Sequence, residues 1–174
     1  MVDSRGYEFE GRSPEIHSNA FVARDATLVG EVTVASNASV WPGATLRGDV
    51  GPVEIGPAAR IEENTSLHVV TVGERGMVAD GAVLNEATVG DGAVVGFNAT
   101  VTEAEIGPRS VVAAGAVVQR GTDVPPESFV HGVPARITPL SETSIDAGGI
   151  YDAYTTGEYD SLPARHAELF GNDE

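Results

Sequence analysis

An aliphatic residue occupies every sixth position of the chain from Ile16 to Leu46. Six consecutive matches of this kind are expected by chance on the order of once in 10⁴ trials, so the spacing is a repeat. The series comprises Ile16, Val22, Leu28, Val34, Val40 and Leu46. Three residues after most of them stands Asn, Asp or Gly, which tolerate φ > 0 and therefore suit a corner of the chain. The pattern predicts a parallel β-helix whose coils are built from six-residue units.

The repeat continues with two interruptions, a step of nine residues from Leu46 to Ile55 and a step of eleven from Leu67 to Val78. It then runs to Val118, which predicts an all-β domain of about six three-sided coils within residues 1–140. Residues 141–174 carry two weak helical signals. Ser144 is expected to cap a helix that extends to about Tyr154, and Ser161 to cap one over 162–170. We expect this helical tail to pack along the outside of the prism.

The composition narrows the choice of partners. The formal net charge is −16, all ten basic residues are Arg, and there is no cysteine. An acidic surface disfavours nucleic acid, and the missing cysteine excludes disulfides and thiolate metal sites. Acidity without lysine favours a protein that works in concentrated salt, and chance loss of lysine from an acidic mesophile protein is the alternative. Without an apolar run of about 20 residues or a signal peptide, we expect a cytoplasmic protein with no membrane partner.

A family resemblance rests on the string Trp41-Pro42-Gly43-Ala44-Thr45-Leu46-Arg47-Gly48-Asp49. This string resembles the γ-class carbonic anhydrases, and the resemblance extends from about Tyr7 to Arg136. It implies a left-handed β-helix that assembles as a homotrimer and hydrates CO₂ to bicarbonate at a metal held between subunits. The exit Gly-Val-Pro-Ala-Arg at 132–136 is also found in hexapeptide acyltransferases.

The resemblance places Arg47 and Asp49 near the subunit interface and the active cleft. An Arg–carboxylate pair is planar and bidentate, which suits either holding subunits in register or orienting an anion. A purely structural pair is an equally good expectation for these two residues.

The zinc ligands of the family are only partly present. His68, in Ser66-Leu67-His68-Val69, matches one ligand, whereas Asp80 and Asn85 stand where the resemblance implies two further histidines. A carboxylate partly neutralises the cation that must acidify bound water, and an amide oxygen is a weak zinc ligand. If a metal is bound at all, this set suits a harder divalent ion better than zinc, and we expect the site to work without one.

Glu62 has two readings. In the family the matching string is often Asn-Ile-Gln-Asp, and here it is Arg60-Ile61-Glu62-Glu63. Glu62 could accept a proton from metal-bound water, or join His68 and Asp80 as a ligand across an interface. In the other reading Arg60, Glu62 and Asp80 form side-chain ion pairs in place of the cation, and the joint change of these residues favours it.

Three functions follow. The first is a carbonic anhydrase with an altered metal site, in which His68 and Asp80 bind the metal, Asn85 contributes weakly and Glu62 orients water. The second, which the ligand substitutions favour, is a non-catalytic trimer of the same family that serves as a scaffold, an assembly subunit or a small-anion binder. The third is an acyltransferase with His68 as general base, because such enzymes use a histidine in a cleft between subunits.

Overall fold

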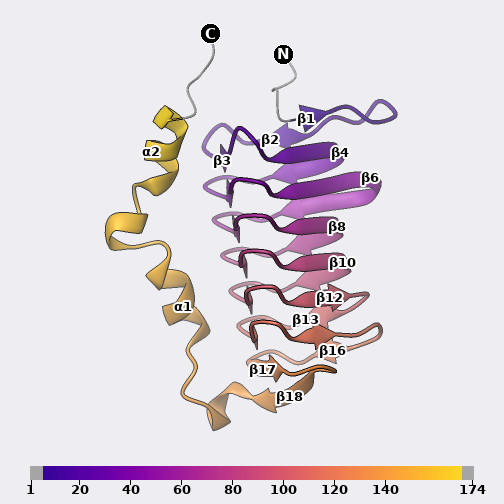
Figure 1. Ribbon diagram of the computed structural model, residues 1–174, viewed down its shortest axis with the longest axis vertical. Coiled ribbons are helices and arrows are strands. Elements are labelled where there is room, and N and C mark those ends of the chain that lie inside the picture. The colour runs from indigo at the N-terminus through magenta and orange to yellow at the C-terminus, as the bar shows by residue number, and fades with distance from the viewer. Residues whose placement is uncertain (1–5, 170–174) are drawn as a thin grey trace.

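The chain folds into a three-sided prism of stacked β-strands, with its C-terminal segment running along one side (Figure 1). The computed structural model describes residues 6–169. Side chains of the six-residue series point into the prism, and those from Val22 to Leu46 are at most 3% exposed. The predicted hexapeptide-repeat, left-handed β-helix with short C-terminal helices is therefore confirmed.

Two parallel sheets form the three sides. One side is an eight-stranded sheet that consists of β3 (Phe21–Val22), β5 (Ser39–Val40), β7 (Arg60–Ile61), β9 (Met77–Val78), β11 (Val94–Val95), β14 (Val111–Val112), β17 (Ser128–His131) and the antiparallel β18 (Arg136–Pro139). The ten-stranded sheet covers the other two sides, because its longest strands bend around the corner between them. It consists of β1 (Gly6–Tyr7), β2 (Glu15–Ile16), β4 (Thr27–Val34), β6 (Thr45–Ile55), β8 (Ser66–Val72), β10 (Val83–Val89), β12 (Thr100–Thr102), β13 (Glu105–Ile106), β15 (Val117–Val118) and β16 (Asp123–Val124).

The prism has about seven turns, one more than the repeat predicts. The eleven-residue step contains a core position that the sequence analysis treated as an interruption, since Val72 is 1% exposed and pairs with Ile55 and Val89. The series also continues past Val118, because Val124 and Val130 are buried in the same core. Each additional coil extends the core with side chains whose burial stabilises the fold by about 1.5–3 kcal/mol apiece.

The nine-residue step is a true insertion. In the pairing of β4 with β6, Gly30 lies opposite Gly48 and Val32 lies opposite Val53, so residues 49–52 bulge out of the ladder. The tip of this bulge is solvent-exposed, with Val50 at 76%. The bulge also carries Asp49 out of its own strand position and toward β8, which bears His68.

The C-terminal segment covers the eight-stranded side (Figure 1). It contains η1 (Leu140–Glu142), α1 (Ala147–Ala153), η2 (Gly157–Tyr159) and α2 (Leu162–Leu169). The first helix is capped by Asp146, which accepts from the Gly148 N–H, and not by Ser144 as predicted. It begins later than predicted because the Asp146 carboxylate satisfies its first free N–H groups. The predicted last residue of α2, Phe170, lies outside the described residues.

Apolar contacts hold this segment on the prism. Met77, Val94 and Val111, in one column of the sheet, pack against Ala147 and Tyr151 of α1. The Tyr151 hydroxyl also donates to the Ala58 carbonyl.

Farther along the same side, α2 brings His166 against Trp41 and Phe21, with ring centroids 5.1 and 6.3 Å away.

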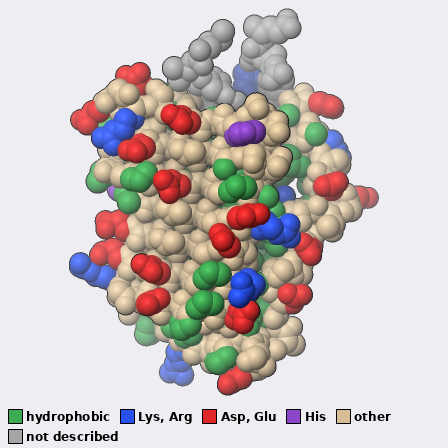
Figure 2. Space-filling model, turned by 180° about the vertical axis from the view of Figure 1, so that it is seen from behind, with side chains coloured by type: hydrophobic (Ala, Val, Ile, Leu, Met, Phe, Trp, Pro, Cys, Tyr) green, Lys and Arg blue, Asp and Glu red, His purple; other side chains and the backbone are tan. Residues whose placement is uncertain are grey.

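Seen from behind the view of Figure 1, the surface carries acidic side chains over its whole height, and they outnumber the basic ones (Figure 2). No helix within residues 6–169 has the length and apolarity that crossing a membrane requires.

Candidate functional site

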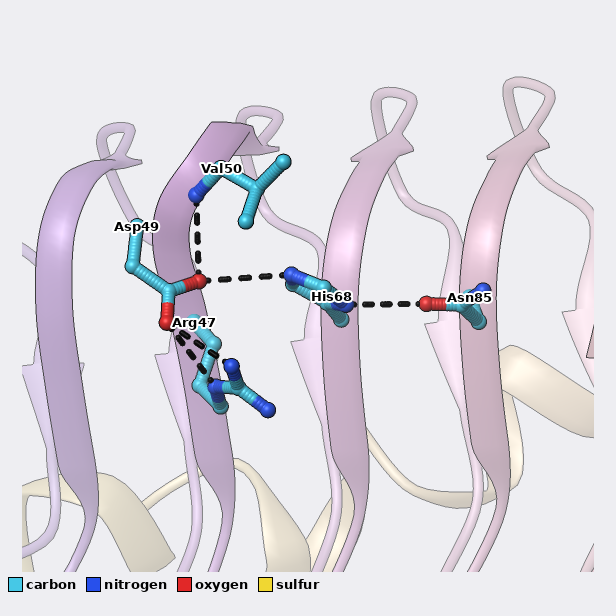
Figure 3. Close-up of polar contacts among 5 residues, drawn as sticks. All are labelled: Arg47, Asp49, Val50, His68 and Asn85. Carbon is cyan, nitrogen blue, oxygen red and sulfur yellow. Dashed lines mark hydrogen bonds and ion pairs between the residues drawn. The ribbon is translucent and has the colours of Figure 1, made fainter.

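Arg47, His68 and Asn85 stand one above another on neighbouring strands. They are Cα partners in the ladders that join β6 to β8 and β8 to β10. The parallel register gives all three side chains the same outward direction (Figure 3), because residues on either side of an inward-facing Leu point away from the core. Asp49, from the bulge, completes a row of polar side chains across the strands.

Both ring nitrogens of His68 face a neighbouring side chain. Nδ1 lies 2.9 Å from Asn85 Oδ1, and Nε2 lies 3.2 Å from Asp49 Oδ1. The Asp49 contact is an ion-pair distance without hydrogen-bond alignment, and Nε2 is buried from solvent with no hydrogen-bond partner within residues 6–169.

Three proton arrangements fit these heavy-atom positions. In one, Nδ1–H donates to Asn85 and a second proton on Nε2 faces the Asp49 carboxylate. In the second, the Asn85 amide is rotated so that its NH₂ donates to Nδ1, and His68 is neutral with its proton on Nε2. In the third, His68 is neutral with its proton on Nδ1, which donates to Asn85, and the Nε2 lone pair faces Asp49. Nδ1 is engaged with Asn85 in all three arrangements, whereas Nε2 keeps a free lone pair in the third.

Asp49 is held as a carboxylate. Its Oδ2 accepts from Arg47 at 2.8 Å from Nη2 and 3.3 Å from Nε, and its Oδ1 accepts from the Val50 N–H at 3.1 Å. The hydrogen bond from Arg47 is the main reason why the pKa of Asp49 is lowered from its usual value. Both Arg47 donors converge on Oδ2, and Oδ1, which accepts from the Val50 N–H, is the oxygen that faces His68.

A strained backbone position adjoins the histidine. Val69 has φ 55°, the left-handed region that β-branched residues strongly disfavour. The chain adopts it because β8 must turn the corner of the prism immediately after His68. At the equivalent corner of the first full coil stands Gly30, with φ 71°.

Asp80 belongs to a second group of side chains. Carboxylate oxygens of Glu62, Glu63 and Asp80 lie within 4.8 Å of one another, at the corner that follows β7 and β9. Glu63 and Asp80 are seventeen residues apart, one coil, and therefore stack in adjacent turns. Burial raises the pKa of Glu63, aided by the charge of Asp80 and by a hydrogen bond that the protonated Glu63 donates to Asp80.

Glu62 is engaged with an arginine. Arg60 Nε donates to Glu62 Oε1 at 2.6 Å, and both residues are buried, at 6% and 4% exposure. The Arg60 guanidinium also stacks on Trp41, with its carbon 5.1 Å from the ring centroid. Burial is the main cause that raises the pKa of Glu62 to about 6, and the Arg60 hydrogen bond opposes it.

The predicted site residues thus fall into two groups within one chain. Arg47, Asp49, His68 and Asn85 form one, and Glu62 with Asp80 forms part of the other. The predicted Arg60–Glu62 ion pair is present, whereas Asp80 lies beside Glu63. A meeting of His68 with Asp80 of another copy stays a prediction. Glu63 has no role among the predicted site residues, although its seventeen-residue separation from Asp80 places the two one coil apart.

A zinc ion of the hydrating type does not fit the donor set. Such an ion needs neutral nitrogen ligands with free lone pairs. In the group around His68, the imidazole is joined by the amide oxygen of Asn85 and by the carboxylate of Asp49, which already accepts from Arg47. The acidic group offers three carboxylates that would cancel the charge that acidifies bound water.

No family model matches the chain. It is 37% identical to a carbonic anhydrase from Geobacillus kaustophilus over 62 residues, which are 36% of this chain and 34% of the relative. It is 35% identical to the mitochondrial γ carbonic anhydrase 2 of Arabidopsis thaliana over 65 residues, which are 37% of this chain and 23% of that protein. The chain thus spans about a third or less of the length of these curated relatives.

The solved structures include a fold neighbour of full length. A hexapeptide transferase family protein from Anaplasma phagocytophilum is 28% identical, has a TM-score of 0.80, and matches over 97% of this chain and 99% of its own. The chain is therefore a left-handed hexapeptide-repeat β-helix that resembles the γ-carbonic anhydrases in part of its sequence and a hexapeptide transferase throughout its fold.

Proposed function

We propose that this protein is a γ-carbonic-anhydrase-like trimer that lacks the zinc centre and does not hydrate CO₂. The observation that carries the proposal is the contact of His68 Nδ1 with Asn85 Oδ1 at 2.9 Å, which joins two of the three positions where the family resemblance implies zinc ligands. With Asp80 and Asn85 at the other two positions, a zinc ion would find one imidazole ligand where a hydrating centre has three.

The Arg60–Glu62 pair supports the same proposal from the other group. A buried carboxylate without a partner is strongly destabilising, and a cation is one way to compensate it. Here the guanidinium supplies the positive charge, at 2.6 Å and with almost no solvent exposure. Glu62 therefore has no need of a metal.

We propose a trimer for two reasons: the resemblance to the γ-class carbonic anhydrases, and the separation within one chain of the group around His68 from the group with Glu63 and Asp80. We expect the corner with Glu63 and Asp80 of one copy to lie against the face with His68 and Asn85 of the next. Light scattering of the purified protein in concentrated KCl tests this assembly, with the mass of three chains as the expected value. A monomer under the same conditions contradicts it.

The central experiment compares CO₂ hydration by the wild type with that by the double variant Asp80→His with Asn85→His. Stopped-flow indicator assays are run with and without one equivalent of added zinc. The wild type is expected to match the buffer rate in both. The double variant is expected to bind zinc if the trimer brings the two groups together, and zinc-stimulated hydration by the wild type overturns the proposal.

The competing proposal is an active carbonic anhydrase with an altered metal centre. It would use His68, Asp80 and Asn85 with a divalent ion harder than zinc, and CO₂ or bicarbonate as substrate. Hydration that appears with Mn²⁺ or Co²⁺ but not with zinc would favour it.

An acyltransferase is a second candidate, and one contact favours it. A histidine that faces a carboxylate, as His68 faces Asp49, is the arrangement of a general base with its orienting group. The full-length fold similarity to a hexapeptide transferase family protein points the same way. Calorimetric titration with acetyl-CoA tests it, and saturable binding that is lost in His68→Gln would favour this function.

A further inference from the structure

A polar cavity lies between the prism and the C-terminal segment, away from His68. Its volume is about 320 Å³, and its walls include Asn19, Asn37, Arg60, Tyr151 and Tyr159. This volume is at the lower end of the range for small-molecule sites, so the occupant has on the order of ten non-hydrogen atoms. The walls come from the first three coils, from α1 and from η2, which makes the C-terminal segment one side of the cavity.

Arg60 gives the cavity its chemical character. Its Nε donates to Glu62, which lies outside the cavity walls, while Arg60 is one of the residues that line the cavity. Guanidinium carries five N–H donors in a rigid fork, so donors beyond Nε remain for a ligand. The side chain is already fixed by Glu62 and by stacking on Trp41, and Trp41 in turn donates to Ser39 Oγ at 3.1 Å. Binding therefore requires little additional ordering of the arginine.

The remaining walls favour a flat, singly charged ligand. Phe21, Tyr151 and Tyr159 supply aromatic surface, and Pro163 adds an apolar edge. Asp160 also lines the cavity and, together with a formal net charge of −16, disfavours a ligand with two negative charges.

We propose that this cavity binds a small aromatic monocarboxylate, with the carboxylate on Arg60 and the ring among the aromatic side chains. The fork of the guanidinium matches the two oxygens of a carboxylate. This site is separate from the His68 group and does not depend on the function proposed above. A bound ligand would join the C-terminal segment to the prism through contacts with both.

Trp41 reports on binding directly. It is the only tryptophan of the chain and lies 5.1 Å from the Arg60 guanidinium. Benzoate is titrated at constant ionic strength while Trp41 fluorescence is followed, and benzamide, the neutral analogue of the same shape, is titrated in parallel. A saturable change with benzoate and none with benzamide is expected. Equal responses to the two, or no saturable response to benzoate, overturn the proposal.

Variants locate the site. Arg60→Lys keeps the positive charge but loses the fork, and is expected to weaken benzoate binding by about tenfold. Tyr159→Ala removes an aromatic side chain from the cavity wall. Because Tyr159 is 47% exposed, this variant is expected to fold, so it tests the site even if the Arg60 variant does not fold. Arg109→Gln, an exposed arginine paired with Glu127, is the matched control and must bind as the wild type does. Wild-type affinity in Tyr159→Ala and Arg60→Lys contradicts the assignment.

Discussion

His68 Nδ1 and Asn85 Oδ1 lie 2.9 Å apart, on adjacent strands and seventeen residues apart in the sequence. These are two of the three positions at which the family resemblance implies zinc ligands. A single hydrogen bond here does what a shared metal would do, since it fixes both side chains relative to the prism. The consequences of this replacement can be measured.

The first prediction concerns the stability of the His68–Asn85 contact. Asn85→Ala removes the partner of a half-buried ring nitrogen and is expected to lower the free energy of unfolding by about 1 kcal/mol. Thr102→Ala is the control, because Thr102 is the Cα partner of Asn85 one coil further along the same column. Urea unfolding of both variants checks the prediction, and equal effects would show that the His68 contact adds nothing.

The second prediction is a pH dependence that originates at Glu62. Its pKa rises from 4.5 to about 6 on folding, so between these values the folded state binds the proton more tightly than the unfolded state. The free energy of unfolding is therefore expected to fall by about 2 kcal/mol as the pH rises from 4 to 7, and to gain no further contribution from Glu62 above pH 7.

The test of this pH dependence is a difference between two proteins. Glu63 also has a raised pKa and acts in the same direction, so the wild type alone does not isolate Glu62. Glu62→Gln removes one titrating group, and its stability should vary less steeply between pH 4 and 7 than that of the wild type. Parallel curves for the two proteins would place the titration elsewhere.

The third prediction uses the strained corner. Val69 at φ 55° is expected to destabilise the fold, and Asn tolerates this conformation better. Val69→Asn should raise the free energy of unfolding by about 1 kcal/mol. Val83→Asn, on the extended strand β10, should give no such gain, because Asn is disfavoured in strands. A loss of stability in Val69→Asn would show that its side-chain packing outweighs the strain.

The fourth prediction concerns salt. Glu105 and Asp123 are Cα partners on the adjacent strands β13 and β16, so their like charges face one another. The Debye length falls from ~10 Å in 0.1 M salt to ~3 Å in 1 M, which screens this repulsion and that of the whole acidic surface. The melting temperature should rise from 0.1 M to 2 M KCl. The double variant Glu105→Gln with Asp123→Asn should have a higher melting temperature at 0.1 M KCl and a smaller increase up to 2 M. The same increase in both proteins would contradict charge repulsion between these two residues as a cause.

The six-residue period was sufficient to predict the fold, because each inward side chain repeats one geometric role. The period does not predict a core position where an interruption of the repeat surrounds it. Val72 was missed since the five-residue step from Leu67 was read as part of a longer interruption, although five-residue steps recur at Val89 and Ile106. A uniform seventeen-residue coil would have found it.

The site was predicted less completely, for a physical reason. The seventeen-residue coil places His68 beside Asn85 and Glu63 beside Asp80, so these two contacts can be predicted from the sequence. The approach of Asp49 to His68 depends on the path of the bulge at 49–52, and the stacking of Arg60 on Trp41 depends on side-chain rotamers. Neither has a period, and the sequence pattern therefore carries no signal for them.

Zinc binding tests the central claim most directly. Protein purified without chelators is analysed for divalent metals, then titrated with zinc in a calorimeter beside the Asp80→His with Asn85→His variant. We predict less than about a tenth of an equivalent of metal in the wild type and no tight zinc site, because His68 is the one imidazole at the three ligand positions that the resemblance implies. One equivalent of tightly bound zinc per chain in the wild type would contradict it.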